Sequence, residues 1–248
     1  MRTRSRRRRP VTNERQVEVH HQHRDVTGGW LRPTVFGMMD GLVSNFALIA
    51  GVAGASSSGS RHAVTLAGLA GLVGGAFSMA TGEYVSVQSQ NESARAEIEV
   101  ERRELRRNSA AEQAELAQMY VQRGVDSDLA ERVAAQLSRD PDQALDIHVR
   151  EELGVSPHAL PSPWIAAGSS LMSFSVGALI PLLPYAFGAT VLWVSAIVSI
   201  VALFVAGAVT AQFTSRSWLF SATRQVVLGG LAAAVTYGVG QAFGAVTG

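Results

Sequence analysis

The sequence predicts an all-α integral membrane protein with five transmembrane helices and a three-helix lobe between the second and third spans. Charge is segregated along the chain: 47% of the 248 residues are hydrophobic and the mean hydropathy is +0.16, although 17% are charged. Residues 153–215 contain no Asp, Glu, Lys or Arg, and residues 41–60 and 225–248 are also uncharged. Because a membrane-spanning helix needs about 20 apolar residues, these stretches are long enough to span, the first of them twice.

The five spans are expected over residues 35–55, 63–87, 164–183, 190–213 and 225–245. They divide the chain into a tail over 1–34, spans 1 and 2 within 35–90, the lobe over 91–155, and spans 3 to 5 within 163–248. Pro181 and Pro184 are expected to end span 3, because proline has no N–H for the helical hydrogen bond. The first apolar run lacks an Ala-x-Ala-like exit, so no cleaved signal peptide is expected.

The arginines predict the orientation in the membrane. Residues 1–34 carry nine Arg and three acids, and residues 91–152 carry nine Arg and fifteen acids. The tail, the lobe and the connection with Arg216 and Arg224 fall on one side, and the other side has only Arg61. Positively charged segments stay on the cytoplasmic side, so we expect a cytoplasmic tail and lobe, in a bacterial inner membrane. Beside a span, a basic tail is typical of orientation and anionic-lipid contact rather than nucleic-acid binding.

Three helices are expected in the lobe. Span 2 is expected to continue without a break to about Gly124, because no helix breaker lies between Glu83 and Asn108. A second helix is expected from Ser127 or Asp128 to about residue 138, with Asp128-x-x-Glu131 as a capping box. Asp140-Pro141 is typical of an N-cap followed by proline at the first helical position. The third helix should therefore begin there and end at Gly154.

Two acidic pairs dominate the lobe. If the first helix is continuous, Glu101, Glu104, Glu112 and Glu115 fall within an arc of roughly 80° on one face. Like charges on one face repel each other, so the pattern favours a bound cation. The chain has no Cys, so carboxylate, imidazole or thioether ligands remain, which suit Fe²⁺ or Mn²⁺. The alternative is an ordinary surface helix whose glutamates pair with neighbouring arginines.

Other residues could extend this site. Glu151 and Glu152, with His148, stand at the end of the third helix, where the helix dipole disfavours carboxylates. Their unfavourable position would be explained if these side chains packed against the acidic face of the first lobe helix. Whether His148 and Glu151 bind metal stays open, as it does for His20, His21 and His23 in the tail.

Two carboxylates lie within or beside the spans. Asp40 and Glu83 are the only acids outside the tail and the lobe. A charged residue at the centre of a bilayer costs about 2.5–3.5 kcal/mol, so it is typical of a pathway. Met79 lies one helical turn from Glu83 on the same face, and carboxylate with thioether can ligate Fe²⁺. The alternative is that Asp40 reaches the interface and Glu83 marks the end of span 2.

Five segments together resemble the vacuolar iron transporter family, from about Phe36 to the C-terminus, and span 2 is closer to its nodulin-like branch. The segments are Asp40-Gly-Leu-Val-Ser-Asn, Ser78-Met-Ala-Thr-Gly-Glu-Tyr-Val-Ser, the four lobe glutamates, Glu151-Glu152-Leu-Gly, and Gly177-Ala-Leu-Ile-Pro-Leu-Leu-Pro-Tyr.

The resemblance implies a homodimer in the lipid bilayer that exports Fe²⁺, and often Mn²⁺, from the cytoplasm in exchange for protons. It implies a secondary transporter, not an enzyme, with no prosthetic group, whose lobe binds the same metal ions. Asp40 and Met79 match the family's pathway residues, and Glu83 is added to them here. The matching lobe ligands are Glu101, Glu104, Glu112, Glu115 and Glu152. The alternative is a membrane-anchored metal sensor or store that does not transport.

Two positions depart from the family pattern. Gly71 stands where the better-known branch has a Glu, and Glu83 is expected to substitute for it. His148-Val149 replaces a pair of methionines in the lobe, so the metal preference of the lobe is left open.

Overall fold

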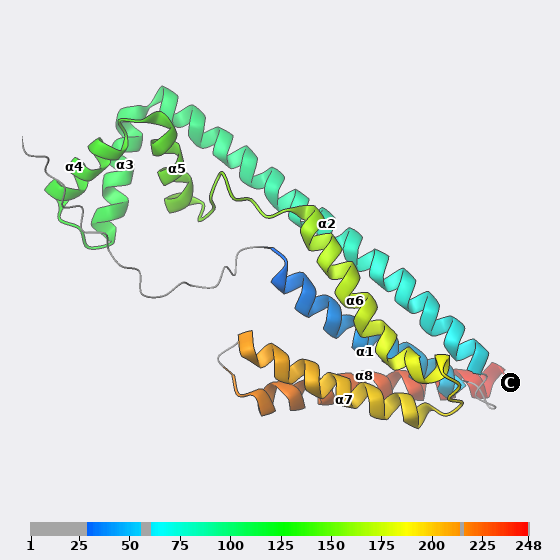
Figure 1. Ribbon diagram of the computed structural model, residues 1–248. Helices are drawn as coiled ribbons and strands as arrows, with labels where there is room; N and C mark the ends of the chain where they lie inside the picture. Colours follow the sequence, from blue (N-terminus) through cyan, green and yellow to red (C-terminus); the bar gives the residue numbers. More distant parts are fainter. Residues whose placement is uncertain (1–28, 56–60, 214–215, 248) are drawn as a thin grey trace, which may run out of the picture.

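The computed structural model describes residues 29–55, 61–213 and 216–247, and all regular structure within these ranges is helical (Figure 1). The basic tail, with Arg6 to Arg9 and the three tail histidines, lies outside the described residues. Five helices are long and apolar enough to cross a membrane. They are α1 (Leu31–Ala55), α2 (Arg61–Arg107), α6 (Pro163–Ala186), α7 (Leu192–Thr210) and α8 (Trp218–Thr247), with a 3₁₀ turn η1 (Ala211–Phe213) after α7. The predicted all-α class with five membrane helices is confirmed.

The lobe is formed by α3 (Ser109–Gln122), α4 (Ser127–Leu137) and α5 (Pro141–Glu152), and by the end of α2. At 1.5 Å per residue, the 47 residues of α2 are roughly 70 Å long, whereas the hydrocarbon core of a bilayer is about 30 Å thick. Asn91 of α2 still donates to the carbonyl of Pro161, just before α6, so it is the last third of α2 that extends beyond the bundle and carries the lobe (Figure 1).

Helix α1 lies at the centre of the bundle, where α6 and α8 are its main neighbours. Glycine permits the contact with α6, because the two backbones almost touch. A Cβ on Gly41 would lie 2.3 Å from the carbonyl oxygen of Phe174, and a Cβ on Gly177 would lie 2.3 Å from that of Met38. Small residues allow this close approach between helices in lipid, where dispersion replaces the hydrophobic effect. Asn45 adds a hydrogen bond, its Nδ2 donating to the carbonyl of Ala178 over 2.6 Å.

Gly177→Ala is expected to destabilise the bundle by about 1–3 kcal/mol, the usual cost of overpacking, because backbone atoms must move. Gly168→Ala is the matched control on the same helix, since its added Cβ would meet nothing within 4 Å. That control should be neutral or slightly stabilising, because alanine favours the helix. Thermal unfolding of the two variants in detergent measures the difference, and equal melting temperatures would contradict the close packing.

The expected continuous helix from span 2 to Gly124 is wrong. The chain breaks at Asn108, whose backbone has φ −130° and ψ 39°, and α3 begins at Ser109. Asn108 donates its side-chain Nδ2 to Glu104 Oε2 over 2.8 Å, and its carbonyl accepts from the amides of Ala111 and Glu112. Asparagine competes for backbone hydrogen bonds in this way, which favours helix ends over helix interiors.

Other predicted helix boundaries also move. Pro181 and Pro184 do not end α6, which continues to Ala186. Tertiary contacts hold these last turns: Pro181 and Tyr185 are buried, and the Ser195 hydroxyl donates to the Pro181 carbonyl over 2.6 Å.

In the lobe, the N-cap of α4 is Asp126 rather than Asp128, because Asp126 accepts from the amides of Asp128 and Leu129. Asp140 caps α5 as predicted, and Gly154 has the positive φ, +66°, expected just after that helix.

Candidate metal site and membrane cavity

The bend at Asn108 brings side chains from three helices together. Glu101 comes from α2, Glu112 from α3, and His148 and Glu152 from α5. Each offers one ligand atom, and these four atoms all lie within 4.8 Å of one another. Ligand atoms on opposite sides of an ion bound at 2.0–2.2 Å are about 4.2 Å apart, so a small contraction would close the cluster around one ion.

His148 lies at the centre of this cluster. Its side chain is fully buried, and Nδ1 lies 2.9 Å from Glu152 Oε1, 3.2 Å from Glu101 Oε1 and 3.9 Å from Glu112 Oε2. Its Nε2 has no hydrogen-bond partner among the described residues. The neighbouring core of Ile98, Leu145 and Val149 holds this part of α5 against α2. An imidazole among three carboxylates is a donor set that suits divalent ions such as Fe²⁺, Mn²⁺ or Zn²⁺.

The electrostatics of the cluster favour an added positive charge. Glu101 lies on the part of α2 beyond the apolar span, where burial, with Glu152, Glu112 and Glu115, raises its pKa to about 7 against the opposing effect of His148. Burial, followed by the charge of Glu115, also raises the pKa of Glu112. A divalent ion would relieve both the lost solvation and the repulsion between these carboxylates.

The metal-free lobe is expected to lose stability between pH 5.5 and pH 8. The folded pKa of Glu101, about 7, exceeds its ordinary value of 4.5, so the folded protein binds the extra proton. Binding of this proton stabilises the folded lobe. The stabilisation is complete below pH 4.5 and disappears as the pH rises through 7. Melting temperatures of metal-stripped wild type and Glu101→Gln at both pH values measure the effect. The variant should lose most of the pH dependence, and the same dependence in both proteins would contradict the assignment.

The other predicted lobe residues lie around this cluster. Glu104 accepts the hydrogen bond from Asn108 at the bend, and Glu115 acts on Glu101 and Glu112 through its charge. Glu151 pairs with Arg123 and so ties the ends of α3 and α5 together. The predicted single acidic face is therefore wrong in its geometry, because the bend puts the second acidic pair on another helix. Glu101, Glu112 and Glu152 nevertheless meet.

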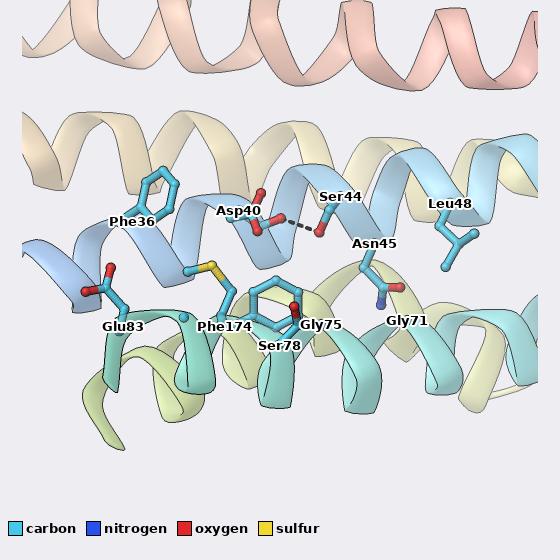
Figure 2. A pocket seen from close by; sticks show the side chains of 12 residues that line it. Phe36, Asp40, Ser44, Asn45, Leu48, Gly71, Gly75, Ser78, Glu83 and Phe174 are labelled. Atoms are coloured by element: carbon cyan, nitrogen blue, oxygen red, sulfur yellow. Dashed lines mark hydrogen bonds between the residues drawn. The ribbon is translucent and has the colours of Figure 1, made fainter. Parts of the chain in front are cut away.

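A cavity of about 470 Å³ lies among α1, α2 and α6 in the membrane bundle. Asp40, Met79 and Glu83, the residues predicted to line one route, all line it. Figure 2 shows Glu83 and Phe36 near one end, Asp40 between the ends, and Leu48 and Gly71 near the other. Because α2 runs from the cavity toward the lobe, Glu83 occupies the end that faces the lobe (Figure 1).

Polar groups that the sequence reasoning missed also line this cavity. Ser44 lies one turn after Asp40 and donates its hydroxyl to the Asp40 carbonyl over 2.5 Å (Figure 2). Asn45 contributes Oδ1, which has no hydrogen-bond partner among the described residues. The signal was the spacing: a polar residue four positions after Asp40 shares its helix face.

These features define a class: an α-helical membrane protein in which carboxylates line a cavity between the spans and a second acidic cluster lies outside the bundle. The chain belongs to the VIT family, whose sequence model matches residues 31–241.

Several proteins of known name are similar to the chain. A protein of Acanthamoeba castellanii named vacuolar iron transporter is 41% identical over 222 residues, 86% of this chain and 78% of the relative. Vacuolar iron transporter 1 of Oryza sativa subsp. japonica is 35% identical, covering 90% of this chain and 89% of the relative. Vacuolar iron transporter 1 of Arabidopsis thaliana is 33% identical, with 88% of each chain covered.

Proposed function

We propose that this protein is a secondary transporter that exports Fe²⁺, Mn²⁺ or both from the cytoplasm in exchange for protons. The observation that carries the proposal is the shared cavity of Asp40, Met79 and Glu83 within apolar spans. A helix that only anchors a protein has no use for buried carboxylates, which are costly in a bilayer and typical of ion pathways. The names of the relatives support iron as the cargo.

The proposed direction starts at the lobe. Arg216 and Arg224 on one side of the bundle, against Arg61 on the other, support a cytoplasmic lobe. There Glu101, Glu112, His148 and Glu152 would capture the ion. Eighteen residues of α2 separate Glu101 from Glu83, a rise of roughly 27 Å.

In the cavity the ion would pass from Glu83 to Met79 and Asp40. Protons arriving from the opposite side of the membrane would neutralise these carboxylates, which weakens their hold on the ion and releases it. The homodimer implied by the family resemblance is part of the proposal.

The test is uptake of Fe²⁺ or Mn²⁺ into proteoliposomes under an imposed pH gradient. Accumulation should require the gradient and should stop when a protonophore collapses it. Metal-free liposomes carrying the same protein, with a pH-sensitive dye inside, control for proton leak. If the purified protein binds metal but moves none under any gradient, the proposal is wrong and a sensor or store is the better description.

A further inference from the structure

We propose that Arg32 gates the end of the cavity that faces the lobe. Its guanidinium is a tethered cation that pairs with the Glu83 carboxylate, and the incoming metal ion must displace this guanidinium. This inference rests on the proposed transport function, because it assigns a role at the mouth of that cavity.

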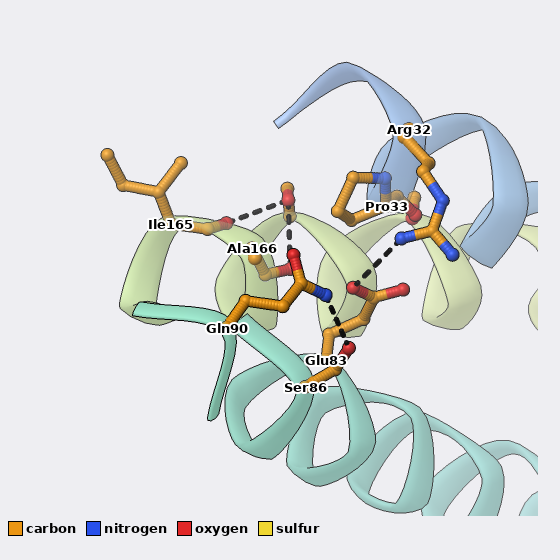
Figure 3. A network of polar contacts seen from close by, with 9 residues as sticks. Arg32, Pro33, Glu83, Ser86, Gln90, Ile165 and Ala166 are labelled. Carbon is orange, nitrogen blue, oxygen red and sulfur yellow. Dashed lines mark hydrogen bonds and ion pairs between the residues drawn. The ribbon is translucent and has the colours of Figure 1, made fainter. Parts of the chain in front are cut away.

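The pairing joins a buried acid to an exposed base. The Glu83 side chain is only 9% exposed, whereas that of Arg32 is 78% exposed, and Arg32 Nη1 lies 3.9 Å from Glu83 Oε2 (Figure 3). Glu83 Oε2 accepts no hydrogen bond from any described residue. The Glu83 carboxylate thus lies in the cavity wall, whereas the Arg32 guanidinium that pairs with it is exposed to solvent. A buried carboxylate needs such a partner, since an uncompensated buried charge is strongly unfavourable.

No other described residue replaces Arg32 in this role. Arg32 is the one cation within ion-pair distance of Glu83 in the described part of the chain. The polar side chains that follow on α2 pair with each other, because Gln90 Nε2 donates to Ser86 Oγ over 3.2 Å (Figure 3). Arg32 also lies in the first turn of α1, where the helix dipole disfavours a positive charge. The contact with Glu83 compensates for that position.

The backbone at this point is fixed, although the Arg32 side chain is free to turn. Pro33 is buried next to it, and its carbonyl lies 3.4 Å from the Ser173 hydroxyl of α6, which shares its proton with the Ser170 carbonyl at 3.2 Å. Opening the pair therefore requires only rotation of a long, solvated side chain, which takes picoseconds to nanoseconds. Such a device can open without any movement of the helices.

The geometry favours exchange over permanent bonding. The Arg32–Glu83 distance of 3.9 Å contrasts with 2.7 Å for Arg102–Glu99 and 2.9 Å for Arg150–Asp146. A single long contact to an exposed guanidinium is a weak ion pair. A divalent ion brings twice the charge and can coordinate the carboxylate directly, so it can take the place of Arg32.

Transport kinetics of Arg32→Gln test the gate. We expect the KM for Mn²⁺ to fall by about two- to fivefold, the range that such an ion pair is worth, with a smaller change in kcat. Arg32→Lys should restore the wild-type KM because it keeps the tethered charge. Arg224→Gln is the matched control: it removes the same charge from a residue that lies 6.0 Å over the Phe220 ring, away from Glu83.

A double variant separates the gate from a general loss of charge. In a Glu83→Gln background, Arg32→Gln should leave the KM unchanged, because the partner through which Arg32 acts is gone. An unchanged KM in Arg32→Gln alone, or an equal shift in Arg224→Gln, would overturn the gate while wild-type transport stands. Failure of the wild type to transport would instead reject the proposed function itself.

Discussion

The triple variant Glu101→Gln, Glu112→Gln and Glu152→Gln is expected to lose the lobe-bound metal ion. It removes three negative charges and three oxygen ligands from one cluster while keeping side-chain size. Losing a partner that merely orients a ligand costs 10- to 100-fold in affinity, so losing three ligands should cost more than about 100-fold. Metal per protein, measured by mass spectrometry on protein equilibrated with Mn²⁺, should fall by the one ion that the cluster holds, because the carboxylates of the cavity are unchanged.

The matched control is the triple variant Glu92→Gln, Glu97→Gln and Glu131→Gln. It removes the same charge from lobe residues outside the cluster, so it should keep the ion. Retention of wild-type stoichiometry by the first variant would show that the cluster is not the metal site.

Asp40→Asn is expected to reduce metal transport by at least about tenfold, which corresponds to 1.4 kcal/mol in the barrier. Asparagine has nearly the shape of aspartate, so the cavity and the hydrogen bond from Ser44 to the residue 40 carbonyl should persist. What disappears is the negative charge in the middle of the cavity, which the ion would need there and a proton would later neutralise. Initial rates in the proteoliposome assay measure the change.

Ser175→Ala serves as the control for Asp40→Asn. It removes a hydroxyl on α6 that donates to the Leu171 carbonyl within its own helix, outside the cavity. Its rate should match the wild type. A wild-type rate in Asp40→Asn would remove Asp40 from the pathway and would leave Glu83 as the cavity's functional carboxylate.

The spans and the lobe were predictable from the sequence for different reasons. Apolar length alone identifies a membrane helix, because each backbone group in lipid must be paired within its own helix. The lobe's acids were identifiable by type, but their arrangement was not. The sequence between Glu83 and Gly124 contains no glycine or proline, and of its two asparagines Asn91 lies inside α2 whereas Asn108 marks the bend. An asparagine is therefore a weak signal until the packing of α3 against α4 is known.

The sequence reasoning left the role of His148 open and missed that of Arg32. His148 precedes Glu152 by four residues, and that spacing on α5 could have joined the two on one face. Arg32 was counted with the basic tail, although the structure puts it in the first turn of α1 beside Glu83. No pattern within α1 identifies a partner on α2, because the pairing depends on how the two helices cross.

Because α2 is unbroken between Glu83 and Glu101, a single rigid helix connects the cavity mouth to the lobe. Glu83 and Glu101 lie on this same helix, roughly 27 Å apart along its axis. A 5° tilt of α2 about Glu83 moves Glu101 sideways by roughly 2.4 Å, more than the length of a metal–oxygen bond. Contraction of the lobe around an ion and the angle at which α2 crosses α1 are thus mechanically linked, with no flexible joint between them to absorb the movement.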